Sequence, residues 1–152
     1  MNSLTPIRQP SGYRGYIATR RVRGDRVQQS VQNLVVRDYA QRMKLYLKQP
    51  VVEYGMPGCY MMLESVLEEM PQLEGIVFYS LFQLPERPSR REAIYQRIFD
   101  AGCSLHGALE SMALWQPDDV RRIEDIFRIA RVAHTTQDDM RALMARPERV
   151  GP

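Results

Sequence analysis

Arginine is the residue type whose abundance and spacing most directly suggest chemistry in this chain. The sequence has 152 residues and a net charge of +3, and all of its 21 Lys and Arg residues except Lys44 and Lys48 are arginines. The planar guanidinium suits phosphate and carboxylate groups, although a GC-rich genome would also enrich arginine. One group of arginines crowds residues 20–26, and another occupies positions 87, 90 and 91. The first group predicts an anion-binding loop or a solvated one.

Three further residues could transfer protons, and they are the predicted catalytic residues. Glu53 closes an expected strand, where it could act as a general base, bind sugar hydroxyls or pair with the arginine loop. Cys59 opens an expected helix, whose dipole favours a thiolate, although free cysteine is often a small core residue. His106 lies within an expected strand and could be a proton shuttle or a structural histidine.

Motifs for phosphate loops, dinucleotides and metals are missing from the chain. There is no Walker-type glycine loop, no G-x-G-x-x-G after a strand, no Cys/His cluster with metal spacing and no G-x-S-x-G elbow. The sequence therefore predicts no metal and no cofactor.

Composition limits the class of protein. Hydrophobic residues make up 44% and charged residues 26% of the chain, which is ordinary for a soluble globular protein. No apolar run approaches the roughly 18 residues that a membrane span needs, and residues 1–10 lack the apolar segment of a secretory signal. Two cysteines, Cys59 and Cys103, are too few for a disulfide framework. We expect a cytoplasmic protein.

Hydrophobic periodicity predicts strands that alternate with helices. The expected strands are residues 14–19, 51–54, 75–81 and 104–110, and the expected helices are residues 30–47, 59–70 and 89–101, with a fourth from Pro117 and a short final one capped by Thr136. This alternation predicts an α/β fold: a single three-layer domain at residues 13–145 with a mostly parallel four-stranded sheet, resolvase-like or flavodoxin-like. A flexible arm (1–12) and a disordered tail (146–152) would flank it.

The carboxyl ends of parallel strands position the candidate residues. Ligands of open α/β sheets bind in the crevice beyond those ends, so polar side chains there should converge. The predicted substrate-binding residues are Arg20, Arg21, Gln32, Asn33, Arg37, Tyr54, Tyr79, Ser80 and Gln83. Tyr60 is a further polar residue expected at this edge.

Two short runs, residues 15–20 and 32–40, resemble the catalytic domain of serine recombinases, the resolvases and invertases, within the N-terminal 110 residues. Those proteins begin with a Gly-Tyr strand that leads to an arginine and a nucleophilic serine. Matching Tyr16 to that motif places Ala18 at the arginine position and Arg20 at the serine position. The later Asp-Arg-Leu-x-Arg loop reads Phe-Gln-Leu-Pro-Glu at residues 82–86, without either arginine. The resemblance implies the fold, and the departures argue against DNA strand exchange.

Four runs, residues 14–18, 31–39, 53–63 and 79–85, resemble the sporadic carbohydrate cluster family, and the longest of them is residues 53–63. These small bacterial proteins are named for the sugar-biosynthesis gene clusters that encode them. The resemblance implies a carbohydrate context and assigns no reaction.

We therefore predict a small enzyme of carbohydrate biosynthesis that acts on a phosphorylated, acidic or nucleotide-linked sugar, by isomerisation, epimerisation or elimination. Arg20, Arg21 and Arg37 would bind the anion. A non-catalytic partner subunit of a pathway enzyme and a degenerate resolvase-like nucleic-acid binder remain alternatives. The expected partner is a sugar or sugar phosphate, with a homodimer or a pathway enzyme left open. No membrane is expected, and the modest net charge argues against nucleic acid.

Overall fold

A computed structural model describes residues 11–145, and their contacts divide the chain into two compact units between Val120 and Arg121. Most of the predicted arm (1–12) and the whole predicted tail (146–152) lie outside the described residues. The single domain expected at residues 13–145 stays a prediction.

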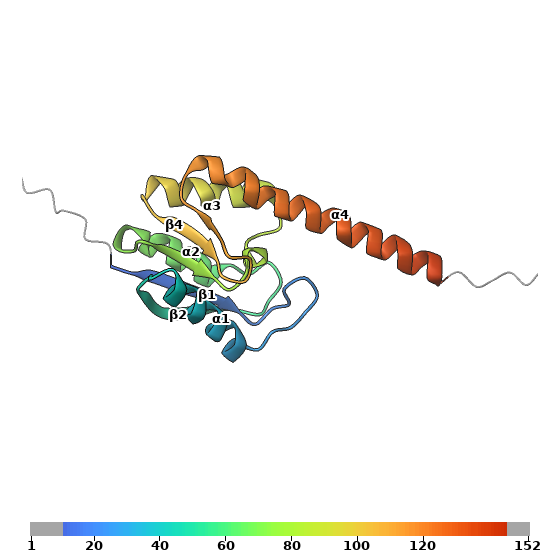
Figure 1. Ribbon diagram of the computed structural model, residues 1–152, viewed down its shortest axis with the longest axis horizontal. Helices are drawn as coiled ribbons and strands as arrows, with labels where there is room; N and C mark the ends of the chain where they lie inside the picture. The colour runs from blue at the N-terminus through green and yellow to red at the C-terminus, as the bar shows by residue number, and fades with distance from the viewer. Residues whose placement is uncertain (1–10, 146–152) are drawn as a thin grey trace, which may run out of the picture. The chain divides into compact units, whose positions relative to one another are not determined.

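The first unit is an α/β fold built on a five-stranded sheet (Figure 1). Its strands are β1 (Tyr13–Ala18), β2 (Leu47–Glu53), β3 (Gly75–Phe78), β4 (Ser104–Gly107) and β5 (Met112–Leu114). They lie in the order β2-β1-β3-β4-β5, and every neighbouring pair is parallel except β4 and β5. The connecting helices are α1 (Gln29–Arg42), α2 (Met61–Glu69) and α3 (Pro88–Asp100). The predicted α/β class and mostly parallel sheet are confirmed.

The fifth strand was not expected, and the prediction of four strands is wrong in that number. The segment expected as one strand at residues 104–110 ends at Gly107. The chain then turns through Ser111, whose φ of 51° is left-handed, and returns as β5 antiparallel to β4. Three residues are too short for a periodic signal, which explains the miss.

Two helix boundaries also differ from the prediction. α1 ends at Arg42 rather than at residue 47, because Lys44 adopts a left-handed φ of 57° and the chain turns into β2. β2 then contains Pro50, which an edge strand tolerates because one side of it has no ladder partner. α2 begins at Met61, so Cys59 precedes the helix instead of lying in its first turn.

Helices lie on both faces of the sheet (Figure 1). Alternating residues of each strand point to opposite faces. On one face, Val36 and Tyr39 of α1 pack in a cluster with Ile17 and Val77. On the other face, the rings of Tyr16 and Phe78 lie 4.9 Å apart. Arg14, which shares the face of Tyr16, pairs with Glu69 of α2. This arrangement fixes which polar residues can reach the edge of the sheet.

The second unit consists, in its described part, of α4 (Val120–Met144) from Arg121 onward. The expected break before a short final helix at Thr136 is wrong. The helix continues through this point, and the hydroxyls of Thr135 and Thr136 donate to the carbonyl oxygens of Arg131 and Val132 one turn earlier instead of capping a new helix. Across residues 11–145, no helix combines the length and the hydropathy needed to cross a membrane.

Gly75 at the start of β3 supplies a test of the sheet packing. A Cβ added there would collide with the backbone carbonyl oxygen of Ser104. We expect Gly75→Ala to lower the free energy of unfolding by about 2–4 kcal/mol. Gly24→Ala is the control, because its Cβ would meet open space and only the φ of 84° is strained, which costs about 1 kcal/mol. If urea denaturation gives equal losses in the free energy of unfolding for the two variants, the close packing of Gly75 against Ser104 is contradicted.

Candidate functional site

The site lies beyond the carboxyl ends of the strands, where β1 is flanked by β2 and β3. The chain leaves β1 toward β2 on one side and later returns to β3 on the other, which makes this edge the topological switch point of the sheet. Segments that follow β1, β2 and β3 line an open cleft of about 840 Å³ there. The lining residues are Arg20, Arg21, Gly55, Pro57, Gly58, Tyr60, Phe82, Leu84, Pro85, Glu86, Arg87 and Arg90.

Arg20 connects the three segments around the cleft. Its Nη1 donates to the Cys59 carbonyl oxygen at 2.8 Å, and its Nη2 donates to the Gln83 carbonyl oxygen at 3.3 Å. The same Nη2 also donates to the Tyr16 hydroxyl at 3.1 Å. Three hydrogen bonds from one guanidinium therefore tie the end of β1 to the loops before α2 and after β3.

Glu53 supports this arrangement from inside the fold. Its Oε2 accepts a hydrogen bond from the Tyr16 hydroxyl at 2.7 Å, while its two oxygens accept from the backbone N–H groups of Met62 at 3.0 Å and Leu63 at 2.9 Å. Those N–H groups belong to the first turn of α2, where the helix dipole favours an anion. Burial, and then the bond to Glu53, raise the pKa of Tyr16, so its hydroxyl stays a donor.

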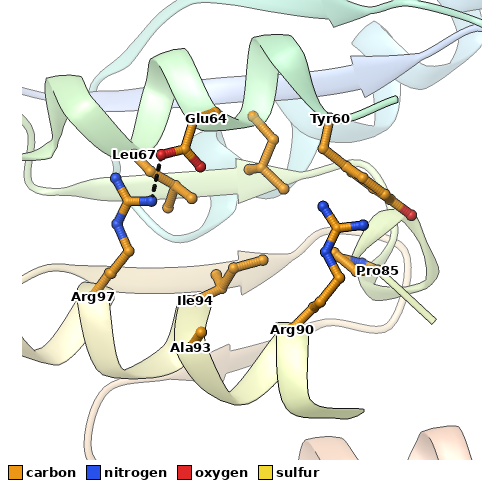
Figure 2. A pocket seen from close by; sticks show the side chains of 9 residues that line it. Tyr60, Glu64, Leu67, Pro85, Arg90, Ala93, Ile94 and Arg97 are labelled. Atoms are coloured by element: carbon orange, nitrogen blue, oxygen red, sulfur yellow. Dashed lines mark hydrogen bonds and ion pairs between the residues drawn. The ribbon is translucent and has the colours of Figure 1, made fainter. Parts of the chain in front are cut away.

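Tyr60 brings two arginines together at the cleft wall. The guanidinium carbon of Arg20 lies 4.2 Å from the centre of the Tyr60 ring, and that of Arg90 lies 4.9 Å from the same centre. Figure 2 shows Arg90, from the start of α3, beside this ring. A smaller groove of about 160 Å³ between α2 and α3 shares Tyr60 and Arg90 and also contains the Arg97–Glu64 ion pair.

The charge of the cleft is unbalanced. Four of its lining residues are arginines and one, Glu86, is a carboxylate. Within residues 11–145, none of the cleft arginines forms an ion pair. Like charges held this close repel one another unless an anion neutralises them. This excess of positive charge favours an anion over a cation in the cleft.

The predicted site residues are divided between the cleft and other places. Arg20 and Arg21 line the cleft, and Cys59 lies half-buried at its margin with its carbonyl oxygen bonded to Arg20. Tyr54 is exposed just after β2, and Arg37 is exposed on α1. Neither of these two belongs to the cleft lining.

Three predicted binding residues form a buried network behind the cleft instead of lining it. Gln32 bonds both the N–H and the carbonyl of Ala18, at 3.1 and 2.7 Å, and accepts from Gln83 Nε2 at 2.9 Å. The Ser80 hydroxyl donates to Glu110 at 2.7 Å. Gln32, Ser80 and Gln83 are each at most 2% exposed. They fix the positions of the loops that carry the arginines.

Asn33 and Tyr79 also lie outside the cleft lining. Asn33 on α1 is half-buried, and its Oδ1 accepts no hydrogen bond from the described residues. Tyr79 is buried, and burial together with the nearby Glu110 raises the pKa of its hydroxyl. Burial also raises the pKa of Glu110, against the hydrogen bonds from Ser80 and Leu81.

His106 lies among the residues that face α1, whereas Glu53 faces α2. Its Nδ1 is 2.7 Å from the Tyr39 hydroxyl and its Nε2 is 2.8 Å from the Ser104 hydroxyl. The ring also contacts Tyr13 and Trp115 edge-on. Burial lowers the pKa of His106 to about 4, so the imidazole is neutral near pH 7. The structure therefore does not bring His106 and Glu53 together in one site.

Arg87, Arg90 and Phe82 are cleft residues that were not among the predicted site residues. The arginine group at positions 87, 90 and 91 was the available signal, but its members play different roles. Arg91 is buried and braces the loop by donating to the Pro85 and Glu86 carbonyl oxygens at 3.0 and 2.6 Å. The spacing of these arginines along the chain does not reveal that Arg91 supports the loop from inside while Arg87 and Arg90 line the cleft.

Arg20 should contribute more to stability than Arg90. Arg20→Met removes three hydrogen bonds and leaves two backbone carbonyls without this donor, so we expect a loss of about 1–3 kcal/mol in the free energy of unfolding. Arg90→Met removes an exposed stacking contact, which is worth at most about 1 kcal/mol. Guanidinium denaturation of both variants measures the difference. An Arg90→Met loss as large as that of Arg20→Met would contradict the bracing role.

His106 should make folding sensitive to acid. The imidazole has a pKa of about 4 when folded and an ordinary value of 6.5. As the pH falls from 6.5 to 4, the unfolded chain gains a proton that the folded chain does not, and stability decreases by about 3 kcal/mol. His106→Gln can still bond Tyr39 or Ser104 and does not titrate, so its urea stability should fall less over this range.

Parallel pH curves for the wild type and His106→Gln would contradict the buried neutral histidine. An NMR titration gives an independent reading that does not depend on the variant folding. The His106 imidazole signals should stay those of the neutral ring down to about pH 5.

Comparison with known proteins supports the fold only. No family model matches the chain, and no curated protein matches it. Among solved structures, it is similar to the N-terminal catalytic domain of TP901-1 integrase, with a TM-score of 0.55 and 12% identity over 84% of this chain and 98% of that one. The architecture is therefore resolvase-like, as in a serine-recombinase catalytic domain.

This finding corrects the predicted function. An enzyme acting on a phosphorylated, acidic or nucleotide-linked sugar was expected, and that prediction is wrong, because the similarity is to a recombinase catalytic domain and nothing connects the chain to carbohydrate chemistry. The resemblance to the sporadic carbohydrate cluster family is likewise unsupported, since no family model matches. What is established is a resolvase-like α/β fold with an arginine-lined cleft at its switch point.

Proposed function

We propose that this chain is a resolvase-fold binding domain that holds a phosphate-bearing ligand in the arginine cleft and performs no serine-dependent strand exchange. The observation that carries the proposal is the convergence of Arg20, Arg21, Arg87 and Arg90 on one cleft with a single carboxylate. Guanidiniums bind phosphate oxygens in pairs of parallel hydrogen bonds, which are stronger than bonds between neutral groups.

The side chains at the cleft support binding rather than strand exchange. The motif match places Arg20 where a serine recombinase has its nucleophile, and Ala18 where it has an arginine. None of the described residues that line the cleft is a serine or threonine. The Ser80 hydroxyl, expected from the sequence to bind the ligand, is buried and donates to Glu110. A phosphate held by these lining residues would therefore meet arginine donors and no serine or threonine hydroxyl of the lining.

The protein should gain thermal stability from inorganic pyrophosphate at constant ionic strength. A ligand that binds only the folded state raises the free energy of unfolding by about 1.4 kcal/mol at ten times its Kd, which for this chain length raises Tm by roughly 3–6 °C. Arg87→Ala/Arg90→Ala removes two exposed donors and should abolish most of the increase.

Arg42→Ala is the matched control for the loss of one arginine. Arg42 lies at the last residue of α1 and outside the cleft lining, and it pairs with Asp38. This variant should keep the full pyrophosphate effect. The proposal fails if wild-type Tm does not respond, or if the double cleft variant responds as strongly as the wild type.

A further inference from the structure

The cleft is larger and more apolar than a phosphate group alone requires. Its volume of about 840 Å³ lies within the range of sites for small organic ligands. Beside the arginines, its lining includes the apolar side chains of Pro57, Phe82, Leu84 and Pro85. Leu84 and Pro85 are buried, whereas Phe82 is half-buried and Pro57 is exposed. A simple oxyanion would leave Phe82 and Pro57 in contact with water, so the ligand that fits the whole cleft has an apolar part.

The charge of the cleft lining favours a ligand with two phosphate groups. Four arginines and Glu86 give the lining a formal charge of +3. A single phosphate group carries about −1.5 to −2 at neutral pH, so one phosphate leaves the cleft with excess positive charge. A diphosphate, with about −3 in total, balances it. Arg20 and Arg90, which share the Tyr60 ring, are close enough to act on adjacent phosphate groups.

The apolar wall is held in a fixed position. Phe82 is half-buried and packs against the core cluster of the α1 face. It belongs to a short 3-10 helix, Leu81–Gln83, whose first turn is closed by reciprocal Ser80 and Gln83 bonds. The Arg23 guanidinium lies 5.0 Å from its ring centre. An aromatic ring that is anchored in this way can stack against a planar base without first losing much conformational freedom.

Glu86 completes the set of recognition groups. It is the only carboxylate among the described residues that line the cleft, and it is exposed. A carboxylate accepts hydrogen bonds from a ribose diol, which no arginine can do. Guanidiniums, an aromatic wall and one acceptor together match the three parts of a nucleotide: phosphates, base and ribose.

We propose, building on the phosphate-binding function above, that the cleft binds a free nucleoside diphosphate. Arg20, Arg87 and Arg90 hold the two phosphate groups. The wall that includes Phe82 receives the base. Glu86 accepts hydrogen bonds from the ribose hydroxyls.

Calorimetric titration of the full chain with ADP and with pyrophosphate, both in EDTA, tests the proposal. Base stacking is worth about 1–3 kcal/mol, a factor of roughly 5–150 in affinity, so ADP should bind at least about fivefold more tightly than pyrophosphate. Phe82→Leu keeps an apolar side chain in the core and should remove most of that advantage, while pyrophosphate affinity stays within about twofold.

Glu86 gives a second readout that carries little folding risk, because its side chain is exposed. The wild type should prefer ADP to 2′,3′-dideoxy-ADP by about tenfold, the effect of one hydrogen bond to a charged acceptor. Glu86→Ala should reduce this preference to near unity, because it removes the acceptor, and should strengthen pyrophosphate binding, because it removes a negative charge. Arg42→Ala should leave all of these ratios unchanged.

The outcomes separate this inference from the function on which it rests. Equal affinities for ADP and pyrophosphate overturn the nucleotide inference and leave phosphate binding intact. No binding of either ligand overturns both. A 20-base-pair duplex that binds and that ADP does not displace overturns the nucleotide inference in favour of nucleic acid.

Discussion

One buried carboxylate holds together the segments that form the cleft. Glu53 is 1% exposed and accepts hydrogen bonds from the Tyr16 hydroxyl and from the N–H groups that begin α2. The Tyr16 hydroxyl in turn accepts a bond from Arg20, which reaches the loops on both sides. A chain of hydrogen bonds thus runs from the end of β2 through β1 to the cleft surface, and its geometry depends on the Glu53 carboxyl group at its centre.

The same use of carboxylates explains why the cleft is positive. On α2, Glu64 pairs with Arg97 and Glu69 pairs with Arg14, so two of the three acidic residues of that helix are engaged by arginines outside the cleft. Glu53 is occupied inside the fold, and Glu110 holds Ser80 and Leu81. The cleft arginines are therefore left with Glu86 alone. A chain with a net charge of only +3 can thus concentrate positive charge in one cleft, because several of its carboxylates are bonded to groups outside that cleft.

Much of the fold could be predicted from the sequence, and much less of the site. The alternation of helical and strand hydrophobic periods predicts the α/β class. The strand β5 could not be predicted, because its three residues are too few to show a period. Gln32, Ser80 and Gln83 lie at strand ends and helix starts as expected, but long-range hydrogen bonds bury them. The sequence does not reveal on which face of the sheet His106 and Glu53 lie, so it could not show that the two residues belong to different sites. Arg90 and Tyr60 meet only through tertiary packing.

The most direct test is the position of tungstate in crystals grown with that anion, a phosphate analogue whose tungsten atom scatters X-rays strongly. The account predicts a tungstate peak within hydrogen-bond distance of the Arg87 and Arg90 guanidiniums, with Arg20 still bonded to the carbonyl oxygens of Cys59 and Gln83. A cleft without tungstate, in which these arginines instead pair with carboxylates of the same chain, would contradict it.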